Sequence, residues 1–111
     1  MFERVSQGAV DVIRGDFPLD RDHTKEVTRL LLQCLDNSQP YVVFDLENVP
    51  LIDSAGLEVL LDFTEEFQEL GGALKLAAPN PLCSEILSVT GVSGSVEIFR
   101  DALAAAGSFA R

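Results

Sequence analysis

The sequence has little positive charge: eighteen Asp and Glu residues stand against eight Lys and Arg, which gives a formal net charge of −10 at pH 7. A surface with this excess of negative charge is repelled by the phosphates of nucleic acids and by anionic membranes. We therefore exclude both as main binding partners. If the chain binds another protein, its charge favours a partner with a basic face.

Long apolar runs are also missing. No stretch approaches the roughly 18 apolar residues that a membrane-spanning helix needs. The first ten residues, MFERVSQGAV, carry charges where a signal peptide would have an apolar segment. The two cysteines, Cys34 and Cys83, are far apart and fit no metal-binding or redox spacing. We expect a cytoplasmic protein that inserts into no membrane and keeps both thiols as small core side chains.

The residue patterns of common enzyme sites are absent as well. The chain has no GxSxG nucleophile elbow, no glycine-rich phosphate loop and no spaced set of metal ligands. Its only histidine, His23, lies beside Asp22 in a loop before a helical pattern, where a capping or surface role is more common than catalysis. These absences predict no catalytic residue, no cofactor and no metal site.

One class of small acidic α/β domain, the aspartyl-phosphate receiver, needs separate consideration because Asp45 and Lys75 fall in successive strand patterns. A receiver also needs an acidic pair at the end of its first strand, which holds a divalent cation near the phosphorylated aspartate. The only acids after the opening strands lie in a loop that contains a proline: Asp16, Asp20 and Asp22. This arrangement argues against a receiver.

What is present is an alternation of strand and helix patterns with no linker between them. A chain of 111 residues, 47% of them hydrophobic, can bury one core, so we expect a single domain over residues 1–111. YVVFDL (41–46) and ALKLAA (73–78) are apolar almost throughout, as are strands buried on both faces of a parallel sheet. Apolar residues recur at helical spacing in the segments 24–36, 54–70, 82–91 and 100–107.

This alternation predicts an α/β fold with a mixed, mainly parallel sheet of four or five strands and about four helices. The segment ERVSQGAVDVIRG carries a turn signal at Ser6-Gln7-Gly8, which predicts an antiparallel hairpin at the N-terminus. The two apolar strands are joined by one helix, so they should lie side by side and parallel. VEIF (96–99) predicts a last short strand.

The helix expected over 54–70 carries acids at steps of four, three and four, and it contains no lysine or arginine. These acids share one face and should be exposed, whereas Leu57, Leu60 and Leu61 should be buried. The acids of this stripe are Glu58, Asp62, Glu65 and Glu69. The stripe is either a solvated face or a docking surface for a basic partner, and the sequence leaves both interpretations open.

Ser54, in VPLIDSAGLEVLL (49–61), lies where that helix begins. Its hydroxyl could cap the helix by accepting a backbone N–H, or it could accept a phosphate, which the amides and dipole of a helix N-terminus favour. Gly56 in the first turn costs up to about 1 kcal/mol relative to alanine. We therefore expect the missing side chain to have a use, namely to give a partner close access to the serine.

The stretch VVFDLENVPLIDSAGLEVLL, followed by LGGALKLAAPNP, resembles the signature of STAS domains, a family that includes the bacterial anti-sigma factor antagonists. The resemblance implies a STAS-like fold and a binding protein without catalysis. It further implies that Ser54 is phosphorylated by a serine kinase that is itself an anti-sigma factor. In the family, the unmodified antagonist binds this kinase and frees the sigma factor, and a phosphatase resets the switch.

The resemblance extends to individual residues around the serine. Asp53 matches the acidic residue that precedes it, Gly56 matches the family glycine, and Ala55 replaces a residue that is often a second serine. Leu19-Asp20 matches a segment that helps to contact the kinase, but Asp16-Phe17-Pro18 before it looks like an insertion. The partner-binding residues implied in this way are Asp20, Asp53, Ser54, Ala55, Gly56, Glu58 and Asp62.

STAS domains also occur outside sigma-factor control. They serve as scaffold components of stressosomes and as small subunits of lipid-trafficking ABC transporters. A non-catalytic subunit or scaffold of this kind needs only the fold and a constant interface, whereas the phosphorylation switch needs an accessible Ser54. Both functions remain open at the level of the sequence.

Overall fold

The computed structural model describes residues 1–36 and 39–110, and its centre is a sheet of five strands in the order β1-β2-β3-β4-β5. β1 and β2 form an antiparallel hairpin, and each later pair of neighbouring strands is parallel. The strands are β1 (Phe2–Gln7), β2 (Val10–Gly15), β3 (Tyr41–Asp45), β4 (Ala73–Ala77) and β5 (Ile98–Phe99). The predicted mixed sheet with an N-terminal hairpin is therefore confirmed.

Two details of the strands refine the prediction. The hairpin turn falls at Gly8 and Ala9, because Ser6 and Gln7 still belong to β1, and Gly8 adopts a positive φ of 65°. β3 and β4 lie side by side and parallel, as the two apolar runs predicted, with Val43 opposite Lys75. VEIF is a strand only over its last two residues.

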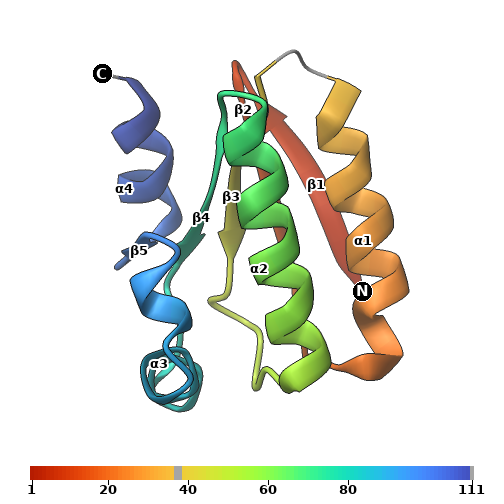
Figure 1. Cartoon of the computed structure of the whole chain (residues 1–111), viewed down its shortest axis with the longest axis vertical. Coiled ribbons are helices and arrows are strands. Elements are labelled where there is room, and N and C mark those ends of the chain that lie inside the picture. Colours follow the sequence, from red (N-terminus) through yellow and green to blue (C-terminus); the bar gives the residue numbers. More distant parts are fainter. Residues whose placement is uncertain (37–38, 111) are drawn as a thin grey trace.

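Four α-helices are found in the described residues: α1 (Thr24–Gln33), α2 (Ser54–Glu69), α3 (Pro81–Val89) and α4 (Ala102–Gly107). Three of them are preceded by a capping residue whose side chain accepts a backbone N–H, namely Asp53 for α2, Asn80 for α3 and Asp101 for α4. Figure 1 shows α1 and α2 side by side against the sheet, with α3 at one end of the molecule.

The pleat of the sheet divides the core into two clusters. Phe44 and Leu76 point toward α1 and α2, where they pack with Leu31 and Leu60 in the larger cluster. Val43 points to the opposite face, where a smaller cluster packs against α4. The strand run YVVF is therefore apolar because both faces of β3 are covered.

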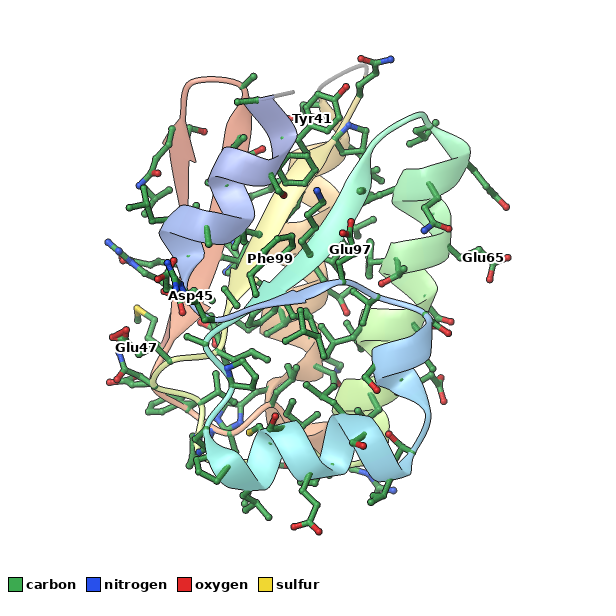
Figure 2. The ribbon with its side chains drawn as sticks, turned by 90° about the vertical axis from the view of Figure 1, so that its left-hand side faces the viewer. Tyr41, Asp45, Glu47, Glu65, Glu97 and Phe99 are labelled. Atoms are coloured by element: carbon green, nitrogen blue, oxygen red, sulfur yellow. The ribbon has the colours of Figure 1, made fainter. Side chains whose placement is uncertain are left out.

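One buried cation lies on the α4 face of the sheet. The Lys75 ammonium donates a hydrogen bond to Ser108 Oγ (2.6 Å) and lies 4.1 Å from the centroid of the Phe109 ring. It also lies 3.5 Å from Glu97 Oε1. In Figure 2, Phe99 and Glu97 lie near one another at the middle of this face, and Tyr41 lies toward its upper end. The contacts join the segment after α4 to the middle of β4.

The predicted division of α2 into two faces is confirmed for the acids and wrong for one leucine. All four acids of the stripe are exposed and Leu60 is buried, but Leu61 is 38% exposed and Leu57 is half-buried. The buried side of α2 follows Leu60, Phe63 and Phe67, and Leu61 lies about 100° around the helix from Leu60. A single residue step is enough to move a side chain from the core to the flank.

Candidate functional site

The start of α2 lies at the carboxyl edge of the parallel strands, the edge at which open α/β sheets bind their ligands. β3 ends at Asp45, and residues 46–53 lead from there to α2. The loop after β2 reaches the same place, where Leu19 and Ile52 form a short parallel bridge. Leu19 N–H donates to the Leu51 carbonyl (3.0 Å), and Asp53 N–H donates to the Leu19 carbonyl (3.1 Å). Two segments far apart in sequence thus meet at the first turn of α2.

Asp53 is the residue that caps α2. Its Oδ1 accepts the Gly56 N–H (2.9 Å), and its Oδ2 accepts the Arg21 N–H (3.1 Å). The hydrogen bond from Gly56, with a smaller one from Arg21, holds the pKa of the Asp53 carboxyl below its usual value. One carboxylate therefore satisfies the helix end and also fixes the 19–23 segment against it.

Ser54 is the first residue of α2, directly after its cap. Its side chain is exposed, and its hydroxyl makes no hydrogen bond with any residue in the described part of the chain. The capping role that the sequence allowed for Ser54 thus belongs to Asp53. The hydroxyl is consequently accessible and is not needed to satisfy the helix end.

The structure gives a different reason for glycine at position 56 from the one that we expected. Gly56 is buried, and a side chain there would collide with the backbone carbonyl of Leu19 and with the Leu19 side chain. The expectation that Gly56 gives a partner access to the serine is therefore wrong, because the chain's own loop occupies that space. The glycine permits the close approach of two backbone segments.

The other predicted site residues differ in exposure. Asp20 is half-buried, and its Oδ1 accepts the Asp22 N–H (3.1 Å) and lies 2.7 Å from His23 Nδ1. Glu58 and Asp62 are exposed on α2, about one and two turns beyond Ser54, whereas Ala55 is half-buried. The predicted site residues thus divide into an exposed group (Ser54, Glu58, Asp62) and a group that holds the backbone in place (Asp20, Asp53, Gly56).

Two exposed leucines at this edge were missed by the sequence reasoning. Leu51 is 38% exposed in the loop before α2, and Leu82 is 51% exposed in the first turn of α3. The two segments are joined by Asn80, whose Nδ2 donates to the carbonyls of Val49 (3.3 Å) and Pro50 (3.2 Å). VPLI resembles a continuous core segment, but only Val49 and Ile52 are buried. A period-two strand pattern would have placed Leu51 on the same face as the buried Val49, so these four residues carried no signal for its exposure.

Other kinds of site find no support in the described residues. Nowhere in residues 1–36 and 39–110 do three or more His, Cys, Asp or Glu side chains gather as they would around a metal ion. Within the same ranges, none of the helices has the length and apolar character to cross a membrane.

Comparisons with solved structures agree on one fold. A candidate anti-sigma factor antagonist from Thermotoga maritima superposes with a TM-score of 0.90 at 20% identity, covering 99% of this chain and 95% of that chain. An anti-sigma factor antagonist (STAS) domain protein from Planctomyces limnophilus gives 0.86 at 22% identity, covering 99% and 98%. The phosphorylated form of the Bacillus cell fate determinant SpoIIAA gives 0.71 at 17% identity, covering 94% and 96%.

Sequence comparison gives the family. No curated protein matches the sequence. The family model described as the STAS domain matches residues 2–105, nearly the whole chain, including the DSAGL turn at the start of α2. The fold has the five-stranded mixed sheet and four helices of the STAS structures above. The chain therefore belongs to the STAS domain family.

Proposed function

We propose that the chain is an anti-sigma factor antagonist, a non-catalytic protein of the cytoplasm that binds an anti-sigma factor serine kinase. Phosphorylation of Ser54 by that kinase turns binding off, and a phosphatase restores it. The observation that carries the proposal is the exposed hydroxyl of Ser54 at the start of α2, which makes no hydrogen bond within the described residues and lies beside a cap that Asp53 supplies. Because the helix end is already satisfied, a phosphate on Ser54 leaves the fold intact.

The proposed binding surface combines apolar and acidic side chains around the hydroxyl. Leu51 and Leu82 supply exposed apolar area at the same edge. Glu58 and Asp62 supply negative charge that attracts a basic partner over a longer range. Asp20, Asp53 and Gly56 act through the backbone that they hold in place. Ala55 lies between the serine and the glycine.

The switch follows from the chemistry of phosphoryl transfer. An acceptor hydroxyl must approach the terminal phosphate of the nucleotide bound to the kinase. Once Ser54 carries a phosphate, with a charge near −2, the same approach brings like charges together and forces a strongly hydrated group into the interface. Binding of the modified protein should therefore be weaker, although the charge of α2 still favours a basic partner.

The test uses the cognate kinase with ATP, intact-mass analysis of the product and a binding titration. Wild type should gain one phosphate, and Ser54→Ala should gain none and should bind with or without ATP. Ser54→Asp should fold but bind more weakly. Ser84→Ala is a matched control, because Ser84 is also an exposed serine in the first turns of a helix. Phosphate on another residue, or equal affinity of both forms, would refute the switch and favour a scaffold or subunit of a stressosome or lipid-trafficking ABC transporter.

A further inference from the structure

A groove of about 610 Å³ runs between α1 and α2. Most of its lining comes from α1, and Val59 contributes from α2. The apolar part of the groove consists of Leu32, which is 50% exposed, and Val59, which is half-buried. Thr24 and Thr28 complete the wall on the α1 side. The groove is therefore a partly apolar surface beside two helices that the described part of the chain leaves uncovered.

The two rims of the groove differ in charge, although Asp36, in the short turn after α1, adds one carboxylate at the end of the basic rim. Lys25 and Arg29 lie one turn apart on α1 and line the groove. Asp62 and Glu66 follow Val59 at steps of three and seven residues, which places them on the same side of α2 as Val59. They lie just outside the lining of the groove, in an adjacent acidic hollow with Glu65 and Glu69. The side chains of Lys25, Arg29, Asp62 and Glu66 are all solvent-exposed.

Within residues 1–36 and 39–110, these four charges have no ion-pair partner. In the described residues, neither Lys25 nor Arg29 has a carboxylate oxygen within 4.0 Å, whereas Arg4, Arg14, Lys75 and Arg100 each do. Asp62 and Glu66 likewise form no ion pair in this part of the chain. The basic rim and the acidic rim are thus both available to an occupant of the groove.

We propose that this groove is a self-association surface, and that its occupant is a second copy of the chain related by a two-fold axis along the groove. Such an axis places α1 of one protomer opposite α2 of its partner, and the reverse contact follows from symmetry. Both helices begin at the same edge of the sheet and run in the same direction (Figure 1). After the rotation, α1 of one protomer and α2 of its partner therefore start at the same height along the two-fold axis. Each basic rim then faces an acidic rim, and the apolar residues meet at the centre.

A second copy fits because the required pattern is present on the chain itself. An occupant must carry acids opposite α1, cations opposite α2 and an apolar strip between them. A second copy of the chain, after the two-fold rotation, places its acidic rim opposite α1, its basic rim opposite α2 and its apolar residues between them. The net charge of −10 opposes association, but charges farther apart than about 8 Å are largely screened at physiological salt. Ser54 does not line the groove, but Asp62 also belongs to the proposed kinase-binding surface. Self-association is therefore measured without the kinase, so that its outcome does not depend on phosphorylation of Ser54.

The test is sedimentation equilibrium of the whole chain at physiological salt, with two double charge reversals. K25E/R29E makes both rims acidic and D62K/E66K makes both rims basic. Each variant alone should self-associate at least about tenfold more weakly than wild type, since several ion pairs become repulsions. An equimolar mixture of the two should form a heterodimer, because each rim again faces its opposite. E47K/E85K is the control that matches the net charge of D62K/E66K, with both acids exposed and away from the groove.

Dimerisation of wild type and of E47K/E85K, its loss in each reversal and its return in the mixture would establish the interface. Circular dichroism and urea unfolding of each variant distinguish loss of association from loss of the fold. A wild-type chain that is still monomeric at about 1 mM, the weak end of specific association, would overturn the inference. Dimers that survive both reversals, or a mixture that remains monomeric, would also overturn it.

Discussion

The backbone carbonyl of Leu19 fills the space in which a side chain at Gly56 would lie. Gly56→Ala should therefore force the 19–23 loop away from α2, at a cost of about 1–3 kcal/mol for overpacking. The gain in helix propensity, up to about 1 kcal/mol, offsets only part of this cost. The free energy of unfolding in urea measures the balance. Gly94→Ala is the control, because a side chain there meets nothing within 4 Å, and equal stability of the two variants would contradict the steric argument.

Replacing the two neighbouring residues at the start of α2 should have unequal effects. Asp53→Ala removes the acceptor of two backbone N–H groups and should lower the urea midpoint clearly. Ser54→Ala removes a hydroxyl that makes no hydrogen bond in the part of the chain that the structure describes, and it should change the free energy of unfolding by less than about 0.5 kcal/mol. Asp53→Asn keeps an oxygen acceptor and should fall between them. A larger loss in Ser54→Ala than in Asp53→Ala would return the capping role to the serine.

The lowered pKa of Asp53 makes its contribution to stability depend on pH. A carboxyl whose folded pKa lies below its unfolded value stabilises the fold above the unfolded pKa of about 3.9. That stabilisation is lost as the pH falls through the folded pKa. The difference in unfolding free energy between wild type and Asp53→Asn should therefore be constant above about pH 5 and should shrink below about pH 4. A difference that does not change with pH would mean that the charge of Asp53 contributes nothing.

The fold could be predicted from the sequence because its signals are local and agree with one another. The apolar runs that became β3 and β4 flank a helical pattern that ends at Gly71, where the structure has a positive φ of 80°. The prediction that Glu58, Asp62 and the later acids lie on one exposed face of α2 likewise followed from helix geometry alone. Leu61 was misplaced because α2 buries a narrow stripe, whose width depends on the neighbouring elements.

The site was only partly predictable because its decisive contacts join distant residues. Nothing near Gly56 in sequence indicates that Leu19, 37 residues earlier, packs against it. The cap could not be assigned because Asp53 and Ser54 are adjacent and both are good capping types, so a shift of one residue in the helix start exchanges their roles. The sequence supplied the candidates, and the tertiary fold determined which residue does what.

Phe109 should hold the C-terminal segment onto the sheet. Its ring lies 4.1 Å from the Lys75 ammonium and 5.1 Å from the centroid of the Tyr41 ring. A desolvated cation–π contact is worth about 2 kcal/mol and an aromatic pair about 1 kcal/mol. Phe109→Ala should therefore accelerate amide hydrogen exchange in residues 102–110 by at least about tenfold, with little change in α2. Leu103→Ala, which alters a side chain that is 83% exposed, should leave exchange unchanged, and equal rates in both variants would contradict the anchoring role.

The acidic stripe of α2 should govern how fast the partner kinase binds, not how tightly the complex is packed. Glu58 and Glu65 are both exposed and lie on the face that turns away from the core. Reversing both to lysine should slow association several-fold at low salt and flatten its salt dependence, because long-range attraction to a basic partner is screened by ions. The dissociation rate should change less, since charges at the rim of an interface act mainly on encounter. Stopped-flow association over a salt series measures both rates, with E47K/E85K as the variant of equal net charge. If the two variants bind with the same kinetics, the acids of α2 form only a solvated face of the helix.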